Sequence, residues 1–168
     1  MTPNILVLIG CAFIPFIVAL GWFHPKVFGG QTWKKVANLT DEQNNKAIKP
    51  IQLIVSIILN FLLAFGVFII TVHQTHVLAL TGPDVDAFKG GTALAFMQEY
   101  GENFHTFQHG ITHGLLIGLL LFVIPILGYA VIFERKSFKY LLVNAGFWGI
   151  SLVLMACIIS KWGGVPVY

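Results

Sequence analysis

Hydrophobic positions gather into four long apolar runs, at about residues 5–23, 51–78, 104–133 and 140–160. At ~1.5 Å per helical residue, each run is long enough to cross a hydrocarbon core of about 30 Å. No Asp, Glu, Lys or Arg interrupts them. The pattern therefore predicts an all-α membrane protein, a four-transmembrane-helix bundle that forms a single integral membrane domain over residues 1–168.

The polar segments between the runs contain signals for further short helices. In loop one, Thr40 and Gln43 have the spacing of a helix capping box. In loop two, apolar residues recur at helical spacing at Ala93, Phe96, Met97, Tyr100 and Phe104. We expect short interfacial helices in loops one and two, and the segment from Ala87 to Asn103 is compatible with a cover over the bundle or with the lipid surface.

Charge differs between the loops and predicts how the chain is oriented. Loop one contains Lys26, Lys34, Lys35, Lys46 and Lys49, and loop three contains Glu134, Arg135, Lys136 and Lys139. Loop two contains Asp84, Asp86, Glu99 and Glu102 but only Lys89. By the positive-inside rule, loops one and three are cytoplasmic, both termini lie on the outer side, and the chain is a multi-pass protein of the cytoplasmic (inner) membrane.

The N-terminal run has features of a membrane helix that is retained in the mature protein. No Lys or Arg precedes it, no small-residue cleavage pattern follows it, and the first positive charge is Lys26. Pro15 lies in the middle of the run, where it is expected to kink the helix.

Composition supports the membrane assignment and excludes one class of partner. Apolar residues make up 57% of the chain and charged residues 10%, which is atypical of a soluble domain. The net charge of +3 comes from residues between the apolar runs, with no long basic arm. We therefore expect no nucleic acid partner; the expected partners are the lipid bilayer and, in addition, other membrane subunits or further copies of this chain.

A motif at the end of the first run resembles a known family. Gly21, Trp22, Phe23, Pro25, Phe28, Gly29 and Trp33 fit the pattern G-W-[FY]-x-P-x-x-F-G-x-x-W. This motif is similar to that of the bacterial membrane family called domain of unknown function 1761, and the resemblance implies a small four-helix membrane protein without assigned catalytic or ligand residues. Read by itself, it is an interfacial motif: Pro25 and Gly29 turn the chain, while Trp22, Phe28 and Trp33 anchor it at the membrane surface.

Histidines provide the main candidate chemistry. His105, His109 and His113 recur every four residues and so share one helix face, while His73 and His76 lie near the outer end of the second run. Imidazole binds Zn, Cu, Fe and Ni, so the five side chains are a candidate transition-metal site, with Glu99, Glu102 and Met97 as further donors. Hydrogen bonding at the membrane surface, proton handling and haem ligation are the alternatives, haem being the least supported.

Glycines of the third run predict close helix packing. Gly110, Gly114 and Gly118 recur every four residues, a small-xxx-small pattern that allows a neighbouring helix to approach closely in lipid. We expect these three residues to face another helix of the same chain.

The remaining patterns leave three functions open. No catalytic set is recognised and Cys11 and Cys157 have no paired spacing, which favours a non-enzyme, most simply a structural or accessory subunit of a membrane assembly. A metal- or proton-binding protein that uses the outer histidines is the first alternative. The second is a small transporter or channel-forming oligomer, in which a polar stripe lines a route: Gln52, Ser56, Asn60, Asn144 and Ser151.

Overall fold

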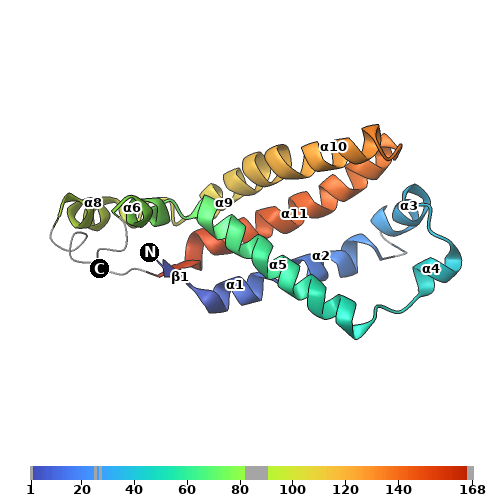
Figure 1. Cartoon of the computed structure of the whole chain (residues 1–168), viewed down its shortest axis with the longest axis horizontal. Helices are drawn as coiled ribbons and strands as arrows, with labels where there is room; N and C mark the ends of the chain where they lie inside the picture. Colours follow the sequence, from blue (N-terminus) through green and yellow to red (C-terminus); the bar gives the residue numbers. More distant parts are fainter. Residues whose placement is uncertain (1, 25, 27, 82–90, 166–168) are drawn as a thin grey trace.

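The computed structural model describes residues 2–24, 26, 28–81 and 91–165. Within them, four helices are long and apolar enough to cross a membrane: Ile5–Trp22, Pro50–Thr71, Phe107–Ile132 and Phe138–Trp162. They form an elongated bundle with short helices at both of its ends (Figure 1). The chain is therefore a largely helical protein with four candidate membrane spans.

The first of these helices consists of two segments, α1 (Ile5–Cys11) and α2 (Ile14–Trp22). Asn4 caps α1 by accepting a hydrogen bond from the backbone N–H of Val7. The two segments meet at Ala12 and Phe13, just before Pro15, which lies in the first turn of α2. Because proline has no backbone N–H, it fits the start of a helix better than its interior. The expected kink is therefore a break between two helical segments.

The second apolar run ends as a helix earlier than the expected boundary at residue 78. Helix α5 covers Pro50–Thr71, and after a break at Val72 and His73 the chain continues as α6 (Gln74–Thr81). The side-chain Nε2 of Gln74 donates to the carbonyl oxygens of Gly101 and Asn103, at 2.9 and 2.8 Å. These bonds fix the start of α6 against the segment after α8 (Thr92–Tyr100), so α6 is a separate element beyond the span.

The third span contains α9 (Phe107–His113), the π-helix η1 (Gly114–Val123) and α10 (Ile124–Ile132). It begins later than expected, because Phe104 has a positive φ of 67° and Thr106 caps the helix by accepting from the backbone N–H of His109. Residue 105 therefore lies before the helix and outside its periodicity.

The fourth span, α11 (Phe138–Trp162), lies at the centre of the bundle and packs against α1, α2, α5, α9, η1 and α10. Gly110, Gly114 and Gly118 face it. A Cβ at Gly110 would overlap the Cα of Cys157, and one at Gly114 would lie 2.5 Å from the Cα of Val153. The third span thus approaches α11 almost backbone to backbone at its α9 end.

Aromatic residues of the interfacial motif contact the first half of α11. The indole Nε1 of Trp22 donates to the carbonyl oxygen of Val143 at 3.1 Å, and the Trp33 ring stacks on Tyr140 at 5.9 Å between centroids. Trp33 belongs to α3 (Phe28–Val36), which begins at Phe28, the second phenylalanine of the motif. Gly29 lies inside α3, so its expected role in a turn is wrong, and Pro25 lies outside the described residues.

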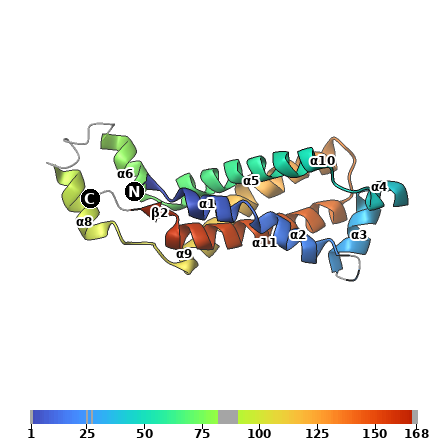
Figure 2. The ribbon, with the colours of Figure 1, turned by 90° about the horizontal axis from the view of Figure 1, so that it is seen from below.

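The remaining short elements mark the two ends of the bundle. At one end lie α3 and α4 (Asp41–Asn45), whose predicted capping box between Thr40 and Gln43 is confirmed, together with the turn from α10 to α11. At the other end lie α6, α8 and the antiparallel pair β1 (Thr2–Pro3) and β2 (Gly164–Val165) (Figure 1, Figure 2). Both ends of the described chain are therefore at the α6–α8 end.

Candidate metal centre and the adjoining cavity

Three imidazoles meet where α5 ends and α9 runs past it. His73 lies in the break after α5, and His109 and His113 lie one turn apart in α9. One ring nitrogen from each lies within 4.8 Å of the other two, and the ring centroids of His109 and His113 are 4.3 Å apart. The arrangement can present three neutral nitrogen donors to one ion.

A backbone hydrogen bond fixes the tautomer of His109. Its Nε2 lies 3.1 Å from the carbonyl oxygen of Thr71. Thr71 is the last residue of α5, and the carbonyl groups in the last turn of a helix have no hydrogen-bond partner within that helix. Because a carbonyl oxygen only accepts, Nε2 carries the hydrogen, and in the neutral ring Nδ1 then has a free lone pair. This is the arrangement of a metal-binding histidine whose other nitrogen is held by a backbone carbonyl.

The electrostatic surroundings of His73 favour its neutral form. Burial, followed by the neighbouring charges of His109 and His76, lowers the pKa of His73 below its usual value. A histidine must be neutral to bind a metal ion, so this shift keeps the side chain ready for binding down to a lower pH.

The other predicted donors are placed elsewhere. His76 is exposed and lies 3.3 Å, through Nδ1, from the carbonyl of His73, and it is not part of the group of three. The Nδ1 of His105 lies 3.4 Å from a carboxylate oxygen of Glu102, outside that group as well. Met97 is buried in the apolar core around α1, α5 and α11, and Glu99 is exposed on α8.

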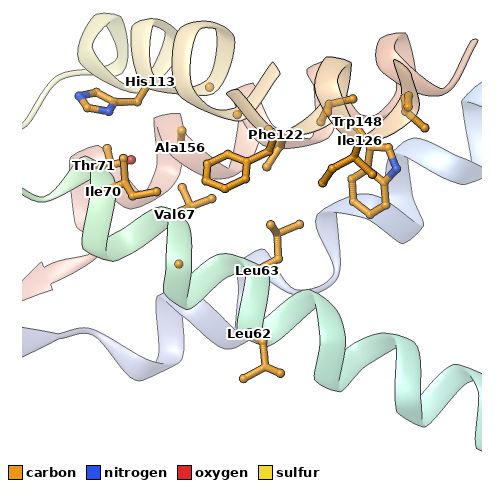
Figure 3. A pocket seen from close by; sticks show the side chains of 16 residues that line it. Leu62, Leu63, Val67, Ile70, Thr71, His113, Phe122, Ile126, Trp148 and Ala156 are labelled. Atoms are coloured by element: carbon orange, nitrogen blue, oxygen red, sulfur yellow. The ribbon is translucent and has the colours of Figure 1, made fainter. Parts of the chain in front are cut away.

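A cavity of about 400 Å³ begins beside His113 and continues along the bundle. It lies between α5 on one side and η1 and α10 on the other, with α11 as its floor (Figure 3). Its walls are almost wholly apolar. They include Leu63, Val67, Phe122, Ile126 and Trp148, and none of the residues of the polar stripe lines it.

Two polar atoms at the histidine end of this cavity have no hydrogen-bond partner within the described part of the chain. They are Oγ1 of Thr71, a residue that is 2% exposed, and Nδ1 of His113. Both side chains line the cavity and lie together at the end opposite Ile126 and Trp148 (Figure 3). Sequence reasoning missed Thr71, because a single threonine near the end of an apolar run gives no periodic signal.

Three residues of the polar stripe form hydrogen bonds within their own helices. The hydroxyl of Ser56 donates to the carbonyl of Gln52, and the hydroxyl of Ser151 to that of Phe147. The amide of Asn144 likewise donates to the carbonyl of Tyr140, each bond staying within one helix. These side chains are thus satisfied locally, as is common for hydroxyl and amide groups inside apolar helices.

Together, the four long apolar helices and the group of three histidines define a helical protein with four candidate membrane spans and a candidate metal centre toward one end. The chain belongs to the family described as protein of unknown function (DUF1761), which matches residues 6–160. This match confirms the family resemblance of the interfacial motif. No curated protein and no solved structure matches the chain.

Proposed function

We propose that this chain is a membrane protein that binds one transition metal ion through His73, His109 and His113. The observation that carries the proposal is the convergence of three ring nitrogens within 4.8 Å, drawn from two separate elements. Zinc is the ion that suits this donor set best, because three imidazoles with an open fourth position are a known zinc arrangement.

The distances are compatible with closure around an ion. At a Zn–N distance of 2.0–2.1 Å, nitrogens of a tetrahedral site lie about 3.3 Å apart. Small side-chain rotations would bring the three rings from their present separation to that value. The hydrogen bond from His109 to the Thr71 carbonyl leaves Nδ1 as the donor atom of that ring, and His73 lies in a short break where its backbone can adjust.

The orientation of the chain is part of the proposal. Helices α3 and α4 and the turn after α10 belong to the two loops that hold eight of the ten Lys and Arg residues, and they lie at one end of the bundle. Helix α9 and the end of α5, next to the three histidines, lie toward the other end (Figure 1). The positive-inside rule then puts the metal site on the outer side of a cytoplasmic membrane. A metal ion would reach it without crossing the hydrocarbon core.

The other predicted functions have less support. A structural or accessory role in a membrane assembly stays a prediction. A transporter or channel role also stays a prediction; three residues of the polar stripe, Ser56, Asn144 and Ser151, bond within their own helices.

Metal content of the purified protein tests the proposal. Wild-type protein is expected to take up about one zinc ion per chain after chelator treatment and zinc addition, and the double variant His109→Ala, His113→Ala to lose it. His24→Ala is the matched control, because His24 lies after α2, outside the group of three. Absence of stoichiometric zinc in the folded wild type, or equal zinc in the double variant, would reject the metal site.

A further inference from the structure

We infer that the cavity between α5 and η1–α10 binds one long-chain carboxylate, with its hydrocarbon chain along the apolar walls and its carboxylate at Thr71 and His113. The inference goes beyond the metal site and does not require an ion to be bound. It rests on the cavity, on the two unpartnered polar atoms and on the length of the walls.

The length of the cavity corresponds to one leaflet of a bilayer. Its wall on α5 extends from Leu62 to Thr71, about 14 Å at ~1.5 Å per residue. This is close to half of a hydrocarbon core of about 30 Å. Thr71 ends its span, so the polar end lies at the boundary of the core and the apolar end near its middle. An acyl chain of one leaflet has this length and this direction.

The shape of the cavity favours a single chain that enters from the side. Helix α5 approaches α9 near the histidines and then diverges from η1 and α10 (Figure 1). Phe122 and Ile126, which line the cavity, are 50% and 64% exposed. The cavity thus opens toward the surroundings of the bundle, which are lipid for a protein in a membrane. A volume of about 400 Å³ is at the small end of ligand pockets.

The polar end favours a head group that accepts hydrogen bonds. The Thr71 hydroxyl can donate, and Nδ1 of His113 donates in the tautomer that carries its hydrogen there. A buried hydroxyl without a partner is destabilising, so a bound acceptor would remove this cost. Among the described residues that line the cavity there is no Asp, Glu, Lys or Arg, so no side-chain carboxylate occupies these two donors. A carboxylate supplies two acceptor oxygens, one for each of these donors.

Photolabelling tests this inference directly. The probe is palmitic acid with a diazirine near the middle of its chain, applied to purified full-length protein in the presence of a chelator. Labelling is expected to saturate, to map to peptides of α5 and η1, and to be competed by palmitic acid but not by a trimethylammonium amphiphile of the same chain length. Labelling that does not saturate, or that the cationic amphiphile competes equally, would identify ordinary surrounding lipid and overturn the inference.

Two glycine variants separate the cavity from the rest of the surface. Gly66 lines the cavity and a Cβ there meets nothing within 4 Å, so Gly66→Leu adds a side chain to the cavity wall at a position where its Cβ has open space. Gly10 on α1 has equally free space and is not among the lining residues, which makes Gly10→Leu the matched control. We expect saturable labelling to fall at least tenfold in Gly66→Leu and to stay unchanged in Gly10→Leu. Equal labelling in both variants would overturn the inference.

Thr71→Val tests the head-group contact. It removes a hydroxyl that has no partner in the described residues, so the ligand-free protein is expected to melt at the same temperature or a higher one. Affinity for palmitic acid should nevertheless fall about tenfold. Unchanged affinity would contradict the proposed position of the carboxylate. Because these measurements are made with chelator, they stand or fall independently of the zinc measurements.

Discussion

The Nε2–H of His109 donates to the backbone carbonyl of Thr71 across 3.1 Å, joining the third span to the end of the second. This one bond positions an imidazole beside two others and leaves its Nδ1 free. It depends on where α5 ends, because only a carbonyl in the last turn of a helix lacks a partner within the helix. The end of a candidate membrane span thereby becomes part of the candidate site.

Enlarging Gly114 should loosen the bundle. In Gly114→Leu the new Cβ would lie 2.5 Å from the Cα of Val153, a backbone atom that cannot rotate away. Such overpacking costs about 1–3 kcal/mol, and the melting temperature in detergent should drop accordingly. Gly66→Leu, with nothing within 4 Å of its Cβ, is the control. An unchanged melting temperature for Gly114→Leu would show that the third span does not approach α11 so closely.

Replacing Trp22 by Phe should destabilise the contact between the first and fourth spans. The variant loses the hydrogen bond from the indole to the Val143 carbonyl, worth about 1 kcal/mol, and leaves Gly146 without its indole neighbour. Thermal unfolding measures the effect. Trp162→Phe serves for comparison, since Trp162 is 52% exposed. If both variants unfold at the same temperature, Trp22 stabilises the fold only through the apolar area that it buries, and the hydrogen bond adds nothing.

Acid should destabilise the metal-free protein through His73. The pKa of His73 is lowered in the folded chain, so the unfolded chain takes up a proton first as the pH falls below about 6.5. Stability is therefore level above that pH and decreases between the ordinary pKa and the lowered one. Melting temperatures in chelator from about pH 8 to about pH 5 should show this slope, reduced in His73→Gln. His24→Gln is the control. If His73→Gln shows the same decrease of melting temperature with pH as His24→Gln, that decrease comes from groups other than His73.

Sidedness can be measured with single cysteines introduced after Cys11 and Cys157 are replaced by alanine. Lys35 on α3 and Glu99 on α8 are both exposed and lie at opposite ends of the bundle. A membrane-impermeant maleimide added to intact cells should label Glu99→Cys and spare Lys35→Cys. The opposite pattern would place the histidines on the cytoplasmic side.

The helices and the stripe of glycines follow from sequence because each depends on local periodicity. Length and hydropathy identify the four spans, and the four-residue spacing of Gly110, Gly114 and Gly118 indicates the face that another helix approaches. The capping box at Thr40 is equally local. These features can be predicted without knowing which helices pack against one another.

The composition of the candidate site could be predicted only in part. The four-residue spacing included His105, but the positive φ of Phe104 and the cap at Thr106 start the helix after it. His73 joins the site because α5 ends at Thr71, a boundary that a continuous apolar run conceals. The cavity arises from the divergence of two helices, a tertiary relationship that has no sequence signal.

The most direct test of the metal site is a count of its imidazole ligands by X-ray absorption spectroscopy of the zinc-loaded protein. Three histidine nitrogens at about 2.0 Å are predicted for the wild type and two for His73→Ala, while His76→Ala should keep three. A wild-type spectrum without imidazole scattering, or one that His73→Ala leaves unchanged, would contradict a zinc site at His73, His109 and His113.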